Sequence, residues 1–380
     1  MAAQRGGRTV PGEQFLAERM STIASSGIRK IFDLAATMKD PIDLSIGQPD
    51  FAVPEAVKSA AIEAIRSDRN GYTVTHGIPE LRERISRSLA EEFDWEPAVL
   101  VTCGVSGGLT LALMACLNPG DEVLLPDPYF VSYTHLVHLC GGRPVPVPIY
   151  DGFTLDAGAF EAAVTPRSKV LLIDSPANPT GVVHSAGEIR AMADLARRHN
   201  LLVISDEIYN LLSYDGPAAS VASYIPNSTL LLRGFGKSYG MTGWRMGYAA
   251  GPEAIVAQMA KLQQFTFVCA PQPAQHACVV ALDTDMSNEV SDYRRKRDLA
   301  VRELQDHYQF ARPAGGFYVF PRIPAGYDSA AAFVEQCVRN SCLVIPGSVF
   351  SGRDTHFRVS YAVPDERLKR GCEVLRRLAG

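Results

Sequence analysis

A lysine in a glycine-rich stretch is the first candidate for chemistry in this chain of 380 residues. Lys237 stands in the sequence Gly234-Phe-Gly-Lys-Ser-Tyr-Gly-Met-Thr-Gly-Trp-Arg245, directly after an apolar run. A lysine amine can form a Schiff base with a carbonyl group, and a guanidinium group such as that of Arg245 can hold an anion. Enzymes that process amino acids through a carbonyl cofactor need this pair of groups.

Two other interpretations of the lysine are open. Gly236-Lys237-Ser238 matches the end of a nucleotide-binding P-loop, but that motif requires glycine where this chain has Leu231. We expect Leu231 to lie in a strand, where the backbone amides cannot cradle a phosphate. A lone lysine could also be a surface residue, and the groups described next argue against that alternative.

Polar residues follow two further apolar runs. Asn178 lies in Asp174-Ser-Pro-Ala-Asn-Pro-Thr-Gly, and Asp206 and Tyr209 lie in Ser205-Asp-Glu-Ile-Tyr. Ligands bind at the carboxyl edge of open α/β sheets, where these side chains would meet. A buried aspartate is costly unless it meets a cation, such as a protonated pyridine nitrogen. Ordinary loop capping is the alternative role for Asp206 and Asn178.

A possible phosphate site precedes these motifs. Val101-Thr-Cys-Gly-Val-Ser-Gly-Gly leads into a helical pattern at 109–117, which places backbone amides and the Ser106 hydroxyl at a helix N-terminus. Tyr129, after another strand pattern, offers a ring for stacking or is a core aromatic. His135 and His138 have a metal-like spacing on an amphipathic helix, and we expect no metal there.

Alternating apolar and helical patterns predict the sheet that positions these groups. Several strand patterns are apolar throughout, which is typical of strands covered on both faces. Between two of them, a capping box at Ser185 and Glu188 starts a helix that ends near Asn200. This alternation predicts a doubly wound α/β sheet. The expected strands are residues 99–102, 122–125, 144–149, 170–174, 201–205, 229–233 and 245–250.

The two ends of the chain have a different pattern. A long charged helix is expected at 289–308, followed by short strands at 317–320, 342–345 and 357–360 and a final helix after Pro364. We therefore expect a large domain at 47–288 and a small C-terminal domain at 289–380. An N-terminal segment at 13–46 would join the small domain, behind a flexible tail at 1–12.

Composition excludes several function classes. There are 37 Lys and Arg against 41 Asp and Glu, a net charge of −4, so we expect neither nucleic acid nor a membrane surface as a partner. No apolar run could span a bilayer, and the N-terminal residues do not form a secretory signal. The eight scattered cysteines predict reduced thiols and a cytoplasmic protein.

Taken together, the motifs resemble those of pyridoxal-phosphate-dependent aminotransferases of fold type I, the class I/II family that includes aspartate and aromatic aminotransferases. The resemblance rests on Asn178-Pro-Thr-Gly, on Ser205-Asp-Glu-Ile-Tyr, and on Lys237 followed by Met-Thr-Gly-Trp-Arg. It extends from about residue 26 to residue 360. It implies a large domain with a mainly parallel seven-stranded sheet, a smaller α+β domain, pyridoxal 5′-phosphate as the cofactor, and a homodimer with shared active sites.

The resemblance also implies residue roles. Lys237 would form the Schiff base and carry the proton, Asp206 would pair with the pyridinium nitrogen, and Asn178 and Tyr209 would bind the phenolic oxygen. The phosphate would be held by the Val105 backbone, by Ser106 and Arg245, and by Tyr72 of the neighbouring subunit. Tyr129 would stack on the ring. Gly47, Asn178 and Arg358 would bind the substrate, with a structural salt bridge as the alternative for Arg358.

Three positions depart from the family pattern, since many members carry serine or threonine where this chain has Gly234 and Gly236, and proline where it has Phe130. We predict amino-group transfer from an L-α-amino acid to a 2-oxo acid, with 2-oxoglutarate as the acceptor, by a ping-pong mechanism. A β-lyase, decarboxylase or cyclase reaction on the same fold is an alternative. A non-catalytic cofactor-binding regulator is another, although we expect no room for a DNA-binding extension before residue 20. Arg29 is a candidate partner for a side-chain carboxylate.

Overall fold

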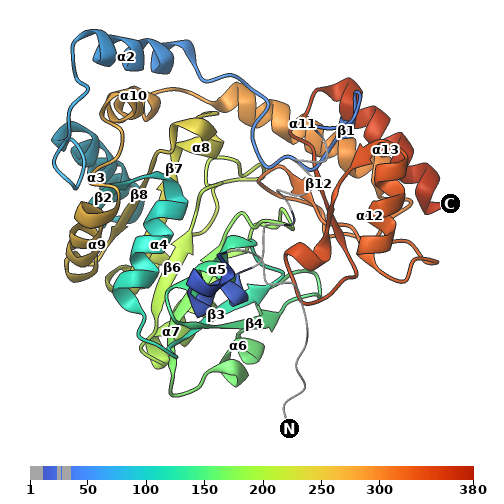
Figure 1. Ribbon diagram of the computed structural model, residues 1–380, viewed down its shortest axis with the longest axis horizontal. Helices are drawn as coiled ribbons and strands as arrows, with labels where there is room; N and C mark the ends of the chain where they lie inside the picture. The colour runs from blue at the N-terminus through green and yellow to red at the C-terminus, as the bar shows by residue number, and fades with distance from the viewer. Residues whose placement is uncertain (1–11, 24–26, 28–35) are drawn as a thin grey trace.

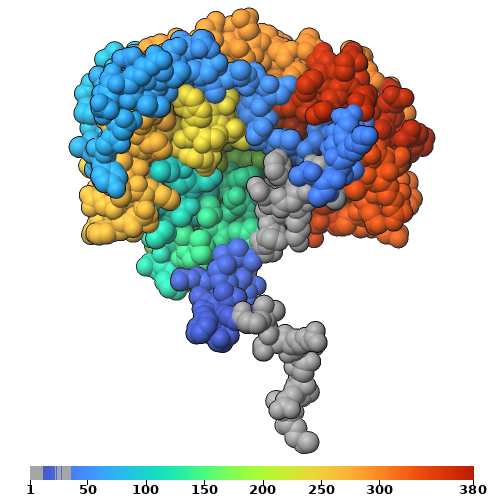
Figure 2. All heavy atoms as spheres, turned by 45° about the horizontal axis from the view of Figure 1, so that its top comes forward, coloured from blue at the N-terminus to red at the C-terminus, as the bar shows by residue number. Residues whose placement is uncertain are grey.

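The computed structural model describes residues 12–23, 27 and 36–380 (Figure 1). The predicted tail, apart from Gly12, lies outside the described residues, and so does Arg29. The short helices η1 (Glu13–Phe15) and η2 (Glu18–Thr22) lie at the edge of the molecule in Figure 2, and η2 contacts α5 (Ser132–Leu139). The Phe15 side chain is 85% exposed.

All seven strands predicted for the large part of the chain pair into one sheet, in the order β2-β8-β7-β6-β5-β3-β4. Six of them are mutually parallel, and β8 runs antiparallel to both of its neighbours. The strands are β2 (Ala98–Thr102), β3 (Glu122–Asp127), β4 (Arg143–Pro148), β5 (Ser168–Asp174), β6 (Leu202–Asp206), β7 (Thr229–Gly234) and β8 (Gly247–Gly251).

Helices cover both faces of this sheet, which explains why its strands are apolar throughout. One face packs on α4 (Gly104–Cys116), α5 (Ser132–Leu139) and α9 (Glu253–Thr266). The other face packs on α2 (Glu55–Arg66), α3 (Pro79–Phe93), α6 (Ala157–Ala163), α7 (Ala186–Arg198) and α10 (Gln272–Ala281). The capping box predicted for α7 is present, with both Ser185 and Glu188 bonds formed.

The C-terminal part carries two small sheets. The first has the order β11-β12-β9, from β9 (Tyr318–Val319), β11 (Ile345–Pro346) and β12 (Phe357–Ser360). The second pairs β1 (Ile42–Asp43) with β10 (Cys342–Leu343), so the N-terminal segment packs among C-terminal elements. These sheets pack with α11 (Ser287–Leu304), α12 (Ala330–Arg339) and α13 (Asp365–Ala379) on one side of the molecule (Figure 1).

The predicted fold class is confirmed, and three element boundaries are corrected. The strand predicted at 342–345 divides between two sheets, because β10 pairs with β1 whereas β11 pairs with β12. The helix predicted at 289–308 ends at Leu304. The strand predicted from Arg245 begins at Gly247, because Arg245 has a left-handed backbone (φ 56°) after the short helix η5 (Thr242–Trp244).

Within the described ranges, every helix is too short or too polar to cross a membrane. All eight cysteines are free thiols.

Candidate active site

The carboxyl edge of the sheet collects the candidate residues. Asp174, at the end of β5, is the register partner of Asp206 at the end of β6, and Asp206 pairs in register with Leu232 of β7. Parallel strands therefore bring the Asn178 loop, the Asp206 turn and Lys237 to one edge. Lys237 lies three residues beyond the end of β7, on the single turn α8 (Phe235–Ser238).

A cavity of about 440 Å³ opens at this edge. Nine of the eleven predicted site residues line it: Gly47, Val105, Ser106, Asn178, Asp206, Tyr209, Lys237, Arg245 and Arg358. Tyr72 and Tyr129 do not line it.

Asp206 is the buried acid of the site. It is 5% exposed, and it accepts hydrogen bonds from the Tyr133 hydroxyl at 2.9 Å and from the Ile208 backbone N–H at 3.2 Å. Burial raises the pKa of Asp206 to about 6, and the hydrogen bond from Tyr133 opposes that shift. Among the described residues no cation hydrogen-bonds to this carboxylate, so it suits a ligand that brings a positive charge.

Lys237 is the amine of the site. Its Nζ donates a hydrogen bond to the carbonyl oxygen of Gly47. Burial and the neighbouring charges of Arg358 and Arg245 lower the pKa of Lys237 to about 8, although Asp206 acts in the opposite direction. A lysine with this pKa has a larger neutral, nucleophilic fraction near pH 7 than an exposed lysine.

The start of α4 forms a cradle for an anion. Gly104 has φ +73°, and a Cβ added there would lie 2.7 Å from Nη2 of Arg245. The guanidinium therefore lies directly against the backbone at the N-terminus of a helix of 13 residues. The Ser106 hydroxyl is exposed beside these unpaired backbone amides. Helix N-termini and guanidinium groups both bind phosphate oxygens.

Arg358 lies opposite this cradle, on β12. Its side chain is 1% exposed, donates to Oδ1 of Asn178 at 3.1 Å and donates to the carbonyl oxygen of Ser45 at 2.8 Å. The rings of Tyr318 and Phe350 lie 4.3 and 4.9 Å from its guanidinium carbon. No carboxylate among the described residues pairs with Arg358, so the salt-bridge alternative has no partner there, and the group is free to bind a ligand carboxylate.

Two predicted aromatic residues of the site, Tyr129 and Tyr72, lie outside the cavity wall. Tyr129 is not in the cavity wall, and its backbone N–H donates to the carbonyl oxygen of Phe350. The next residue, Phe130, lines the cavity where Tyr129 was expected, and stacking on a bound ring stays a prediction for this pair of residues. Tyr72 is 84% exposed, away from the cavity of its own chain.

Several residues of this cavity were not predicted from the sequence. Tyr133 follows Phe130 by one helical turn and supports Asp206, and Tyr318 hydrogen-bonds to Tyr209 between the two hydroxyl oxygens, 3.1 Å apart. Tyr133 lies on the first turn of α5, and its ring meets the edge of the Phe130 ring, with the ring centroids 5.5 Å apart. The position of Tyr318 depends on the approach of β9 to the loops that follow β5 and β6, which no local pattern records.

These features fit pyridoxal 5′-phosphate on the chemistry of the donor set. The α4 cradle and Arg245 suit the phosphate, the buried Asp206 suits a protonated ring nitrogen, and Lys237 suits the carbonyl carbon.

Comparison with known proteins agrees with this geometry. The family model for aminotransferase class I and II matches residues 39–375. The chain belongs to this family. The predicted family, enzyme class and cofactor are thereby confirmed: the protein is a pyridoxal-phosphate-dependent aminotransferase.

Individual relatives match nearly the whole chain. An aspartate aminotransferase of Pyrococcus abyssi is 36% identical, with 94% of this chain and 96% of the relative covered. An aromatic-amino-acid aminotransferase of Thermococcus litoralis is 35% identical with the same coverage. The solved structure of Thermus thermophilus aspartate aminotransferase with maleate has a TM-score of 0.92 at 34% identity, covering 96% of this chain and 99% of that one.

Proposed function

We propose that the aminotransferase moves an amino group from an L-α-amino acid to 2-oxoglutarate by a ping-pong mechanism, with the cavity at the carboxyl edge as its active site. The observation that carries the proposal is the position of Lys237 between the α4 anion cradle and Arg358, which has no carboxylate partner in the part of the chain that the structure describes. One amine, one carboxylate site and one phosphate site are what an α-amino acid and this cofactor need together.

Different residues of the cavity would bind the cofactor and the substrate. Val105, Ser106 and Arg245 would hold the phosphate, Asp206 would pair with the ring nitrogen, Phe130 would stack on the ring, and Asn178 and Tyr209 would bind its phenolic oxygen. Arg358 binds the α-carboxylate of the substrate through two guanidinium donors, next to Gly47. When bound, the cofactor supplies a carbonyl group and an electron-withdrawing ring that delocalises the charge left by deprotonation of the substrate α-carbon.

Lys237 moves the proton. Its neutral Nζ accepts the proton released from the substrate α-carbon and returns it on the cofactor side, and the lowered pKa makes both directions accessible near neutral pH. Asp206 stays ionised when a cation is beside it, because that charge offsets the burial which raises its pKa in the free site.

The test of this function compares Lys237→Ala with Lys261→Ala, a matched lysine on the exposed face of α9. With a panel of L-amino acids and 2-oxoglutarate, we expect the wild type and Lys261→Ala to form glutamate, and Lys237→Ala to bind cofactor weakly without turnover. Wild-type turnover by Lys237→Ala would refute the assigned role. Release of carbon dioxide or of a β-substituent in place of glutamate would indicate a decarboxylase or a lyase, and bound cofactor without any reaction would indicate a regulator.

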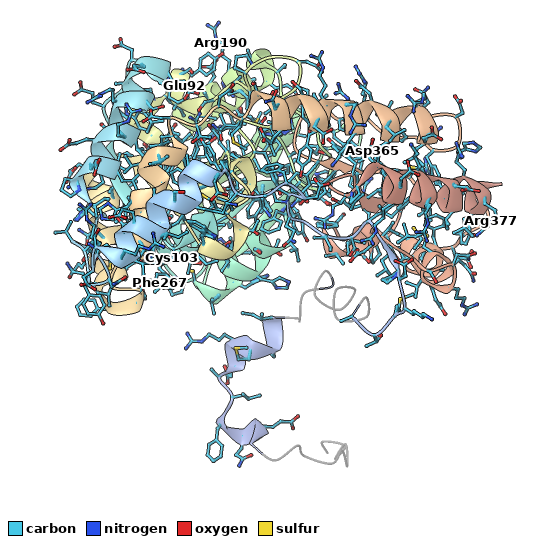
Figure 3. All side chains as sticks on the ribbon, turned by 90° about the horizontal axis from the view of Figure 1, so that it is seen from above. Glu92, Cys103, Arg190, Phe267, Asp365 and Arg377 are labelled. Atoms are coloured by element: carbon cyan, nitrogen blue, oxygen red, sulfur yellow. The ribbon has the colours of Figure 1, made fainter. Side chains whose placement is uncertain are left out.

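We further propose a homodimer in which Tyr72 reaches the phosphate of the partner. Large apolar side chains are exposed near the α4 cradle: Tyr72, Val74, Phe265, Phe267 and Val268. The two segments that carry them are joined by a hydrogen bond from Gln263 to the carbonyl oxygen of Thr75, at 2.7 Å. Phe267 lies beside Cys103 at the start of α4 (Figure 3). An apolar patch of this kind is typical of a protein interface.

The dimer is tested by Phe265→Glu, with Arg190→Glu on α7, at the opposite side of the molecule in Figure 3, as the control. We expect light scattering to give a dimer for the wild type and the control and a monomer for Phe265→Glu. A wild-type monomer with full activity would contradict the proposal.

The remaining parts of the proposal are the division into domains at 47–288 and 289–380, with residues 13–46 joined to the second, and a cytoplasmic location. The pairing of β1 with β10 supports the assignment of residues 13–46 to the second domain. The free thiols support the cytoplasmic location.

A further inference from the structure

One connecting segment crosses the active-site cavity. Residues 45–51, here named the strap, run from β1 toward α2, and residues 45–48 form part of the cavity wall. Two backbone carbonyls of the strap contact the groups proposed to act on the substrate: Ser45 accepts from Arg358, and Gly47 accepts from Lys237. A displacement of the strap would therefore move an acceptor of the carboxylate-binding arginine and of the amine at once.

The far end of the strap is tied to α11 through Asp50. The Tyr293 hydroxyl lies 2.9 Å from Oδ1 of Asp50 and 3.0 Å from its backbone nitrogen, and Nζ of Lys296 lies 2.5 Å from Oδ2. The Lys296 side chain is only 6% exposed and that of Asp50 is 19% exposed. Tyr293 and Lys296 are three residues apart, so both face the strap from one side of the helix.

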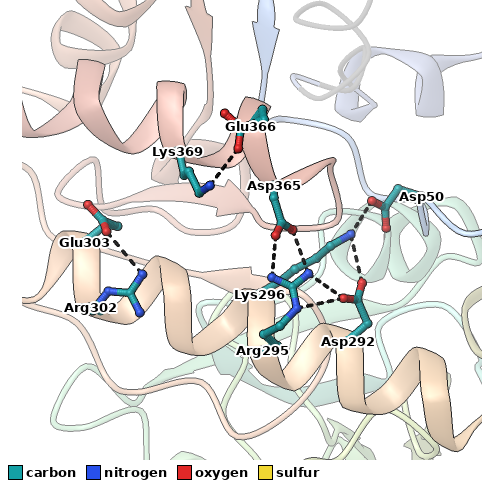
Figure 4. A network of polar contacts seen from close by, with 9 residues as sticks. All are labelled: Asp50, Asp292, Arg295, Lys296, Arg302, Glu303, Asp365, Glu366 and Lys369. Carbon is teal, nitrogen blue, oxygen red and sulfur yellow. Dashed lines mark hydrogen bonds and ion pairs between the residues drawn. The ribbon is translucent and has the colours of Figure 1, made fainter.

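The attachment continues beyond α11. Lys296 also pairs with Asp292 at 3.3 Å, Arg295 joins Asp292 to Asp365 with contacts of 2.6 and 2.5 Å, and Asp365 is the first residue of α13 (Figure 4). The strap is thus fixed directly to α11 and, through Asp292 and Arg295, to α13.

Packing supports the same attachment. The ring of Phe51, at the end of the strap, lies 5.4 Å from that of Tyr293. Gly240, three residues after Lys237, closely approaches Phe51, since a Cβ there would lie 3.1 Å from the Phe51 carbonyl oxygen. A buried ion pair is expensive to desolvate, so the Asp50–Lys296 pair is better explained by a role in positioning than by a gain in stability.

We infer that Asp50 is a positioning residue for the proposed transamination: its attachment to Tyr293 and Lys296 holds the strap carbonyls of Ser45 and Gly47 against Arg358 and Lys237. The inference rests on the proposed function. Asp50 touches neither the substrate nor the cofactor in this account. It acts by fixing the direction in which the Lys237 amine and the Arg358 guanidinium point, and small losses of such alignment reduce rates strongly.

The test uses Asp50→Asn and Tyr293→Phe, with Glu366→Gln as the matched control. Glu366 forms an ion pair with Lys369 on α13, in the same region of Figure 4, and has no contact with the strap. For Asp50→Asn and for Tyr293→Phe we expect KM for the amino acid to rise about tenfold and kcat to fall about tenfold. Asp50→Glu keeps the charge and should recover part of both losses, and Glu366→Gln should match the wild type.

A second measurement separates positioning from general destabilisation. In the cofactor-free protein, we expect amide hydrogen exchange within residues 45–51 to be at least tenfold faster in Asp50→Asn and Tyr293→Phe, with exchange in β5, β6 and β7 unchanged. Tyr293→Phe keeps the aromatic packing and serves alone if Asp50→Asn does not fold. The inference would be overturned if amide hydrogen exchange in residues 45–51 and the values of KM and kcat were all unchanged in the variants. It would also be overturned if exchange became faster throughout the large sheet. A wild type without transaminase activity would refute the proposed function, while the exchange experiment still tests the attachment.

Discussion

The substitution Asp206→Asn tests the electrostatics of the cofactor site. In the free site the Asp206 carboxylate is buried, accepts hydrogen bonds from Tyr133 and Ile208, and has a pKa raised from 3.8 to about 6, chiefly by burial. Asparagine has nearly the same shape, but it has one acceptor oxygen where Tyr133 and Ile208 donate to two different carboxylate oxygens. It can keep the oxygen for the Ile208 N–H and donate from its NH2 group to the Tyr133 hydroxyl, so the substitution removes the charge and reverses one hydrogen bond.

The expected magnitude follows from the pKa difference. A shift of about two units, at about 1.4 kcal/mol each, means that ionised Asp206 costs the cofactor-free protein about 3 kcal/mol at pH 7. Because the folded-state pKa is raised, this cost grows as the pH increases from about 4 through about 6, and at pH 5 it is roughly half of its value at pH 7. A cation beside Asp206 removes the cost, so the wild type should bind the cofactor up to about 100-fold more tightly than the variant.

Two assays measure these effects. Thermal unfolding of the cofactor-free proteins should show Asp206→Asn to be more stable than the wild type, by more at pH 7 than at pH 5. Cofactor titration at pH 7 should show the loss of affinity. Asp174→Asn is the control for affinity, because burial raises the pKa of Asp174 to about 8 and leaves it largely uncharged at pH 7. A less stable cofactor-free variant, or an unchanged cofactor affinity, would refute the reasoning.

Two further substitutions test the binding groups at either side of Lys237. Gly104→Ala places a methyl group against Arg245 at a backbone φ of +73° and should weaken cofactor binding about tenfold or more. The control Gly107→Ala should bind the cofactor normally, because the added Cβ would lie 3.5 Å from its nearest neighbour. Equal affinities of the two variants in a fluorescence titration would contradict the anion cradle at the start of α4. Arg358→Lys replaces the forked guanidinium group, which reaches Asn178 and Ser45, with a single ammonium group. Steady-state kinetics should show KM for the amino acid raised about 100-fold, with a smaller change in kcat. An unchanged KM would show that Arg358 does not bind the substrate.

Local patterns were sufficient to predict most of the sheet and the residues at its edge. Apolar strands followed at once by Asp206 or Asn178 are short-range signals, and parallel pairing in register converts them into proximity. Lys237 and Arg245 could be predicted for the same reason, since both lie in the connection between neighbouring strands β7 and β8.

The features that were missed depend on long-range packing or on the direction of single side chains. Tyr129 and Phe130 are adjacent aromatics after β3, and only the turn into α5 decides which of them enters the cavity. The strap attachment joins Asp50 to residues 243 and 246 positions away, and neither end has a sequence signature. The strand predicted at 342–345 divides between two sheets because β1 pairs with its first half and β12 with its second half. Tertiary packing determines these partners.

The most direct test of the account is the visible absorption spectrum of the purified protein, recorded before and after each of a panel of L-amino acids is added without an oxo acid. The account predicts a yellow band from cofactor bound through Lys237, which converts to the spectrum of the aminated cofactor with some amino acids and is restored by 2-oxoglutarate. A band that no amino acid converts would contradict transamination. No band after addition of pyridoxal 5′-phosphate would contradict the assignment of the cavity itself.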